Sequence, residues 1–232
     1  MSKTCLITGV GPGTGAALVR RFASGGYDVA MLARSEDRLE ALNDEINTAH
    51  AYACDVSDPA FLDITYASIN ADLGAPSVIV HNAVGAEQGT YMDINPDGMR
   101  KAFEINTMAL LQLARLATDD MIKAGGGSII CTGNTSAYRG RSRFAGFAPT
   151  KAAQRILLES IAREAGPKGI HASYVAIDAV IDLAWTREMM PDQPDEFFCK
   201  PVDIAEECYR IAHQPRSAWS FESVIRPYGE TW

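Results

Sequence analysis

A glycine-rich turn near the N-terminus limits the possible folds of this chain more than any other feature. The turn, Thr8-Gly9-Val10-Gly11-Pro12-Gly13-Thr14-Gly15, lies between the apolar run 4–7 and a stretch with helical apolar spacing at 16–23. Glycines permit positive φ and close approach of a ligand, and the N-terminus of a following helix attracts anions. This order predicts a dinucleotide site, the alternative being an ordinary glycine-rich turn. The residues expected at the pyrophosphate are Gly9, Gly11, Pro12, Gly13, Thr14 and Gly15.

Strand-like and helix-like segments alternate along the rest of the chain. Further strands are expected at 27–33, 51–53, 77–81, 128–132, 171–177 and 222–226. Segments with helical apolar spacing separate them, and the longest of these segments are 103–124 and 147–165. The alternation predicts an α/β fold, a Rossmann-like doubly wound parallel sheet in three α/β/α layers. Because we find no repeat or linker, we expect residues 1–232 to form a single domain.

Composition and charge argue against several classes of function. The chain has 21 Lys and Arg against 29 Asp and Glu, for a net charge of −8, which argues against nucleic-acid and anionic-membrane partners. No apolar stretch reaches the roughly 18 residues of a transmembrane helix, and no leader precedes the first strand, so we expect a cytoplasmic protein. The five cysteines and four histidines lack metal-site spacing, so no metal is expected and the thiols are interpreted as reduced packing residues.

An irregular stretch, 182–200, interrupts the alternation after the sixth expected strand. It carries the large apolar side chains Trp185, Met189, Met190, Phe197 and Phe198. An apolar insertion at the carboxyl end of a strand can serve as a lid over a ligand. The alternative is a loop that packs onto its own small core.

Several further motifs together resemble the short-chain dehydrogenase/reductase family, in the family's order and over nearly the full length. Asp55-Val56 resembles the pair that contacts adenine, and His81-Asn82-Ala83 resembles the Asn-Asn-Ala-Gly motif. Asn106 lies where the family has its active-site asparagine, and Lys151 matches the lysine of Tyr-x-x-x-Lys. The resemblance implies a nicotinamide cofactor and an oxidoreductase acting on a small-molecule carbonyl or alcohol. The cofactor contacts that it implies beyond the glycine loop are Asp55, Val56, Asn82, Ala83, Lys151 and Val180.

The chain departs from the family where the catalytic residues are expected. Phe147 stands at the position of the catalytic tyrosine, and Asn134 stands where spacing places the serine. Val84 replaces the last glycine of Asn-Asn-Ala-Gly, and Asp178-Ala179 replaces the Pro-Gly that follows the sixth strand. The cofactor half of the family pattern is therefore kept, and the catalytic half is altered.

These departures matter because reduction of a carbonyl creates a developing alkoxide that must be protonated or stabilised. A phenylalanine cannot supply a proton, whereas the Asn134 amide can still donate a hydrogen bond. Lys151 can hold ribose hydroxyls, and Tyr138 or Tyr91 is a candidate replacement acid. The catalytic candidates are Lys151, Asn106, Asn134 and Tyr138. Two functions stay open: an NADP(H)-dependent oxidoreductase with an incomplete Asn-Ser-Tyr-Lys tetrad, and a non-catalytic NADP(H)-binding sensor or partner subunit.

Cofactor choice and assembly can also be predicted. The second strand ends in Arg34 with no acid at that position, which favours NADP(H) over NAD(H), since arginine matches phosphate oxygens and an acid would repel them. The segments 103–124 and 147–165 are apolar around much of their girth, which indicates burial on more than one side. They match the family's interface helices, so we expect a homotetramer or homodimer.

Overall fold

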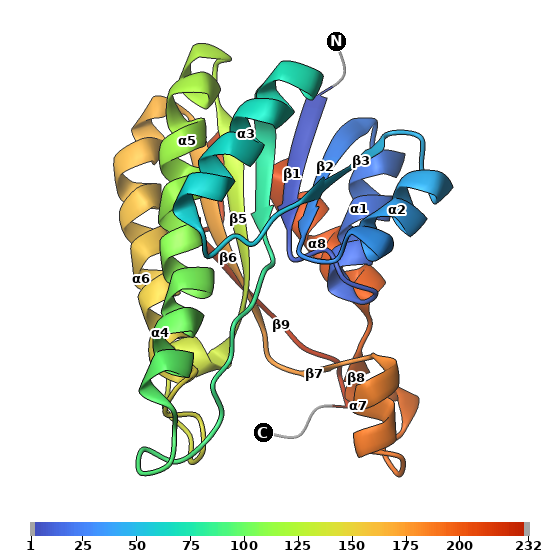
Figure 1. Cartoon of the computed structure of the whole chain (residues 1–232), viewed down its shortest axis with the longest axis vertical. Coiled ribbons are helices and arrows are strands. Elements are labelled where there is room, and N and C mark those ends of the chain that lie inside the picture. Colours follow the sequence, from blue (N-terminus) through green and yellow to red (C-terminus); the bar gives the residue numbers. More distant parts are fainter. Residues whose placement is uncertain (1–2, 230–232) are drawn as a thin grey trace.

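Within residues 3–229, which the computed structural model describes, the main sheet has seven strands in the order β3-β2-β1-β4-β5-β6-β9 (Figure 1). Every neighbouring pair runs parallel. The strands are β1 (Lys3–Thr8), β2 (Tyr27–Ala33), β3 (Ala49–Ala53), β4 (Pro76–His81), β5 (Gly127–Asn134), β6 (Ile170–Ile177) and β9 (Glu222–Ile225). The strand order reverses between β1 and β4, which is where doubly wound sheets bind ligands. The predicted Rossmann-like α/β fold is confirmed.

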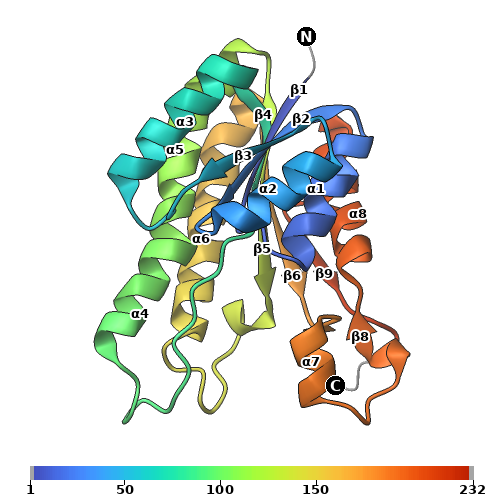
Figure 2. The same ribbon diagram turned by 45° about the vertical axis from the view of Figure 1, so that its right-hand side comes forward.

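Helices cover both faces of this sheet (Figures 1 and 2). One face carries α1 (Thr14–Ser24), α2 (Glu36–Glu45) and α8 (Pro201–Ala212). The other face carries α3 (Pro59–Leu73), α4 (Pro96–Phe103), α5 (Ala109–Lys123) and α6 (Ala148–Ala165). No helix in the described part of the chain is long and apolar enough to cross a lipid bilayer.

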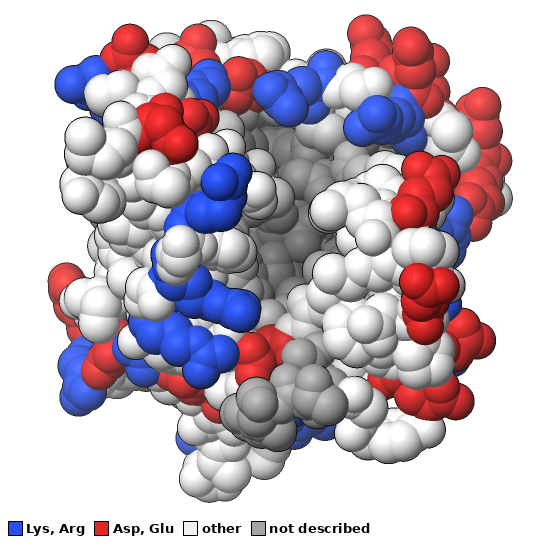
Figure 3. Space-filling view, turned by 90° about the horizontal axis from the view of Figure 1, so that it is seen from below, with Lys and Arg blue, Asp and Glu red and all other residues white. Residues whose placement is uncertain are grey.

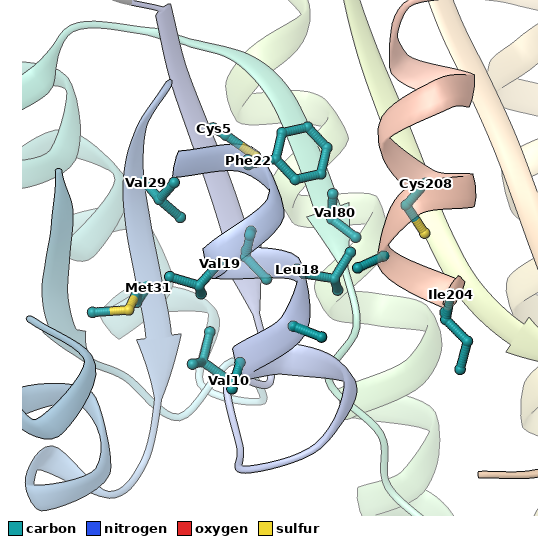
Figure 4. Close-up of a cluster of buried hydrophobic side chains, with 14 of the residues drawn as sticks. Cys5, Val10, Leu18, Val19, Phe22, Val29, Met31, Val80, Ile204 and Cys208 are labelled. Atoms are coloured by element: carbon teal, nitrogen blue, oxygen red, sulfur yellow. The ribbon is translucent and has the colours of Figure 1, made fainter. Parts of the chain in front are cut away.

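Two hydrophobic cores lie between the sheet and these helix layers. Alternate residues of β1 point to opposite cores, because successive side chains of a strand face opposite ways: Cys5 and Ile7 pack under α1, and Leu6 packs toward α3 and α5. Figure 4 shows the first core, in which Leu18 and Phe22 of α1 face the sheet. Each such buried side chain contributes about 1.5–3 kcal/mol of transfer free energy. All five cysteines are free and buried, as the sequence indicated.

The long helix before β5 differs from the sequence expectation in where it begins and in an internal π-helical turn. The helix predicted from Phe103 begins at Pro96, where the Asn95 side chain caps it by accepting from the Asp97 amide at 2.9 Å. It runs through a π-helical turn, η1 (Glu104–Met108), into α5. Ser35 stands at the N-cap of α2, but its side chain makes no capping hydrogen bond. The apolar periodicity showed neither the earlier start nor the π-turn, because Pro96 and its neighbours are polar or small.

The carboxyl ends of the strands meet at one edge, and the loops that follow them gather there (Figure 2). After β6, the chain forms β7 (Val180–Ile181), α7 (Ala184–Met189) and β8 (Phe198–Cys199). β7 and β8 pair in a small parallel sheet, and they lie with α7 below the main sheet in Figure 1. Residues 182–200 are thus an ordered unit beside the loop edge. Figure 3 views this edge directly and shows it hollowed.

Candidate active site

The glycine loop leaves room for a phosphate-bearing ligand and is held in shape by neighbouring backbone. Gly9 has a φ of +69°, and a Cβ there would lie 2.5 Å from the Ala83 backbone, so only glycine fits. A Cβ on Gly15 would lie 2.6 Å from the Gly9 carbonyl oxygen, whereas a Cβ on Gly11 would meet no atom within 4 Å. No side chain of the described residues caps the start of α1. Open space at Gly11 beside an uncapped helix N-terminus fits a pyrophosphate.

The α7 segment contacts this loop through Leu183. A Cβ on Gly13 would lie 2.3 Å from Leu183 Cδ2, so the Leu183 side chain packs directly on Gly13. Thr186 orients this start of α7 because its hydroxyl donates to the Ile181 carbonyl at 2.6 Å and accepts from the Leu183 amide at 3.0 Å. The segment after β6 therefore borders the predicted cofactor site, as the lid hypothesis requires.

The residues expected at the adenosine end follow β2 and β3. Arg34 is exposed and forms no ion pair with a described residue. Val56 is buried, and Asp55 accepts hydrogen bonds from the Ser57 amide at 3.0 Å and hydroxyl at 2.6 Å. Lys101 Nζ lies 3.2 Å from Asp55 Oδ2. Partial burial raises the pKa of Asp55, but the hydrogen bonds from Ser57 and Lys101 outweigh it, so the pKa is lowered and the carboxylate stays ionised.

The end of β4 ties the glycine loop to the rest of the sheet. Asn82 Nδ2 donates to the Gly9 carbonyl at 2.9 Å, and Asn82 Oδ1 accepts from the Thr132 hydroxyl at 2.9 Å. Thr8 Oγ1 accepts from the amides of Asn82 and Ala83, each at 3.1 Å. Asn82 and Ala83 thus contact the glycine loop and its preceding strand, and their predicted contact with a cofactor stays a prediction.

His81 is fully buried, and its uncharged ring forms two hydrogen bonds that connect neighbouring elements. Burial, and next the charge of Lys151, lower its pKa to about 4, so the ring is uncharged at neutral pH. Its Nε2 lies 3.0 Å from the Ile105 carbonyl, which can only accept, so Nε2 carries the proton. Nδ1 then accepts from the Thr8 hydroxyl at 2.9 Å. His81 therefore joins β1, β4 and the π-turn.

Lys151 is the buried cation of the site. Its side chain is fully buried on α6, and Nζ donates to the Thr132 carbonyl at 3.3 Å. Burial lowers the pKa of this ammonium. An ammonium has three donors, so Lys151 retains capacity to bind hydroxyl groups of a ribose.

Asn106 is fully buried in the π-turn and positions the loop after β4. Its Oδ1 accepts from the Gly85 amide at 2.9 Å, and its Nδ2 donates to the Gly85 carbonyl at 2.8 Å and to Thr150 Oγ1 at 2.7 Å. The Asn106 backbone carbonyl accepts from Gln154 Nε2 at 2.6 Å. These contacts show Asn106 as a positioning residue. A direct catalytic role for it stays a prediction.

Phe147 and Asn134 lie at the two positions where the sequence predicts a departure from the catalytic residues of the family. Phe147 immediately precedes α6, and its carbonyl accepts from the Lys151 amide at 3.2 Å, so its ring lies one turn before Lys151. The ring is buried and lies 6.1 Å from that of Phe144. Asn134 ends β5, and its Oδ1 accepts from the Ser136 amide at 3.1 Å. The described contacts thus place Phe147 at the start of the helix that carries Lys151, and Asn134 at the end of the strand whose Thr132 carbonyl accepts from Lys151 Nζ.

Residues 3–189 match the family described as short chain dehydrogenase, which covers well over half of the chain. The chain belongs to this family. It is 26% identical to the 7alpha-hydroxysteroid dehydrogenase of Escherichia coli K12 over 239 residues, which cover 98% of this chain and 93% of that protein. A metagenomic short-chain oxidoreductase in complex with NADP has a TM-score of 0.84 at 25% identity, covering 97% of both chains. An alcohol dehydrogenase from Thermococcus sibiricus complexed with 5-hydroxy-NADP has a TM-score of 0.87 at 24% identity, covering 99% of this chain and 98% of that one.

Tyr138, one of the two candidate replacements for the family tyrosine, lies in the loop after β5 and contacts residues of β9 and α6. Its hydroxyl donates to Glu222, and Arg155 lies 5.3 Å from its ring centroid. Burial, and next the hydrogen bond to Glu222, raise the pKa of Tyr138 and make it a weaker acid. Tyr91, the other candidate, is 80% exposed. A role for Tyr138 in proton transfer stays a prediction, and it requires release from Glu222.

Asp178 belongs to a polar cluster beside Asn134 that the short-chain dehydrogenase motifs do not include. Its Oδ1 accepts from the Thr135 hydroxyl at 2.6 Å, and its Oδ2 lies 3.4 Å from Arg226 Nη2. Val180 follows in β7 and is half-buried, opposite Phe198 of β8. The sequence analysis named Asp178 only as a difference from the family's Pro-Gly pair. It missed Arg226, because a single arginine after the last strand matches no motif.

Proposed function

We propose that this chain is an NADP(H)-dependent oxidoreductase that interconverts a small-molecule carbonyl and alcohol, with an incomplete tetrad. The observation that carries the proposal is the retained cofactor apparatus: a cradle open at Gly11 beside an uncapped helix, and a buried Lys151 with spare donors. The similarity to a metagenomic short-chain oxidoreductase in complex with NADP supports the cofactor. A bound NADP(H) would supply or accept the hydride at its nicotinamide ring.

The chain's own groups would divide the remaining work among them. Lys151 would hold ribose hydroxyls, and the Asn134 amide would donate a hydrogen bond to the substrate oxygen. Phe147 would exclude water from the buried side of the pocket but could not protonate an alkoxide. The proton that balances hydride addition would therefore come from Lys151, whose lowered pKa makes it a better acid, or from solvent.

The preference for NADP(H) over NAD(H) rests on charge at the end of β2. Arg34 and Arg38 are both exposed, and neither forms an ion pair with a described residue. Arg34 directly precedes Ser35, the N-cap of α2, and Arg38 lies within α2. A guanidinium group suits the oxygens of a 2′-phosphate.

A non-catalytic NADP(H)-binding protein is the second candidate, and two observations favour it: Phe147 replaces the family acid, and Tyr138 is bound to Glu222.

The test of both candidates is a direct measurement of NADPH binding, run beside a screen of NADPH oxidation with aldehydes, ketones and conjugated enones. Turnover with any of them supports the oxidoreductase. Binding without turnover supports the second candidate, and absence of binding refutes both.

We also propose that the chain acts as one domain and assembles as a homotetramer or homodimer, in the cytoplasm. Met108 is 45% exposed in the π-turn, and Ile156 on α6 is 57% exposed. Apolar side chains on the outer surfaces of these helices support a second copy as the covering partner. A monomer by light scattering at micromolar concentration would contradict this assembly.

A further inference from the structure

The loop between Asn134 and Phe147 carries an unusual concentration of positive charge. Arg139, Arg141 and Arg143, here called the arginine loop, alternate with small residues and are all exposed. None of the three forms an ion pair with a described residue. Most other arginines of this acidic chain are paired with carboxylates, as Arg155 is with Glu222 at 2.5 Å. The three charges are therefore available to an external anion.

The arginine loop borders the candidate active site rather than a remote surface. It follows Asn134 at the end of β5 and precedes Phe147 at the start of α6. In Figure 1 this part of the chain lies at the lower left, at the loop edge of the sheet, and Figure 3 shows Lys and Arg side chains gathered along that side of the hollow.

The backbone of the loop is held in a defined conformation. The Gly89 amide donates to the Arg143 carbonyl at 3.0 Å, and Gly89 forms a β-bridge with Phe144. Arg143 has a φ of +67°, a left-handed conformation that costs a non-glycine residue about 1–2 kcal/mol. Such strain at an ordered position is characteristic of functional sites.

Two carboxylates on the loops of this edge, Glu87 and Asp178, are already engaged. Glu87 of the β4 loop accepts from the Asn95 amide at 3.1 Å, and its side chain packs on Gly98 and Gly146. Asp178 is held by Thr135 and Arg226.

Large apolar side chains are exposed on the other loops of this edge. Tyr91 and Met92, after β4, are 80% and 78% exposed, and Trp185 and Met189 of α7 are 58% and 69% exposed. Exposed apolar side chains at this loop edge suit a ligand with an apolar body. The arginine loop adds a place for a negative group at one end.

We propose that the arginine loop recognises an anionic group, a carboxylate or a phosphate, on a substrate whose body is apolar. This inference rests on the proposed function, because it assigns the substrate class of the same cleft. Guanidinium groups suit either oxyanion through paired N–H donors. The arginine loop is thus a specificity determinant separate from the cofactor contacts and from Lys151.

The experiment measures binding of three matched aldehydes to the protein saturated with NADP⁺, by calorimetry at low salt. The probes are 4-carboxybenzaldehyde, 4-formylphenyl phosphate and the neutral methyl 4-formylbenzoate. We expect at least one anionic probe to bind about tenfold more tightly than the ester, because each exposed charged pair changes a binding constant by a factor of about 1.5–5. The triple variant Arg139→Gln, Arg141→Gln, Arg143→Gln should lose this preference and keep its affinity for the ester and for NADP⁺. Preference for one anion identifies that oxyanion.

The controls separate charge at this site from net charge and from folding. The variant Arg115→Gln, Arg163→Gln, Lys168→Gln removes the same charge from exposed positions on α5, on α6 and after α6, and should keep the preference. The double variant Arg139→Gln, Arg141→Gln leaves the strained Arg143 in place and should lose most of the preference for the anionic probes. Equal binding of all three probes by the parent, or a preference that survives the triple change, overturns the inference. Failure of the parent to bind NADP⁺ refutes the proposed function instead.

Discussion

Restoring a phenol at position 147 is the most direct test of the altered site. Phe147 lies one turn before Lys151, with its carbonyl accepting from the Lys151 amide at 3.2 Å, so a tyrosine there would place a hydroxyl group on the ring beside the buried ammonium. A positioned acid contributes about 10²–10⁴ in rate, or roughly 3–5.5 kcal/mol of activation free energy. We therefore expect slow or undetectable carbonyl reduction by the parent and a gain within that range for Phe147→Tyr combined with Asn134→Ser.

The assay follows NADPH absorbance with a panel of small carbonyl compounds, for both single variants and the double. A third variant, Tyr138→Phe, removes the hydroxyl now bound to Glu222 and tests the alternative that Tyr138 supplies the proton. A fast parent that is slowed by Phe147→Tyr and abolished by Tyr138→Phe would refute the reasoning and identify Tyr138 as the acid. A double variant that binds NADPH and stays inert would instead implicate the pocket around Asp178 and Val84.

Three further predictions concern the cofactor cradle and stability. Arg34→Asp should weaken NADPH binding by about tenfold or more and leave NADH affinity nearly unchanged, because it removes a charge-assisted contact with the 2′-phosphate. Fluorescence titration measures both affinities, and an equal loss for the two cofactors would contradict the role of Arg34 in NADP(H) preference. Gly9→Ala should abolish NADPH binding or destabilise the fold in thermal melts, because its Cβ would lie 2.5 Å from the Ala83 backbone and φ is +69°. Protonation of His81 opposes folding, because its pKa is about 4 in the folded chain against 6.5 in the unfolded one. The parent should therefore lose about 3 kcal/mol of stability as pH falls from 6.5 to 4, and His81→Asn should flatten that part of the stability curve.

Much of the fold could be predicted because its signals are local. The glycine turn between an apolar run and a helix specifies strand, turn and helix without any distant contact, and Gly9 confirms it with a positive φ. The alternation of strands and helices then predicts a parallel doubly wound sheet, because right-handed crossovers leave few other topologies. The family motifs depend on short spacings, so the positions of Asn82, Lys151 and Phe147 could be read from the sequence.

Contacts between distant segments could be seen only in the tertiary structure. Whether Tyr138 could serve as an acid depends on its hydrogen bond to Glu222, which is 84 residues away along the chain. No residue near Tyr138 in the sequence indicates this partner. The ammonium of Lys151 is buried, and its pKa lowered, by packing between α6 and the sheet. Likewise, the partners of the Asn106 side chain, Gly85 and Thr150, are 21 and 44 residues away along the chain.

Sequence by itself determined the class of fold, the family and the conformation of the glycine turn, because the signals for each lie in residues that are close together along the chain. Tertiary structure decided which polar groups remain free for chemistry. The hydroxyl of Tyr138 is hydrogen-bonded to Glu222 and the amide of Asn106 to Gly85, whereas the Lys151 ammonium donates one hydrogen bond, to Thr132, and the arginine loop forms no ion pair with a described residue. The physical reason is that a polar group's availability depends on its partners, and the folded sheet brings those partners together from distant parts of the chain.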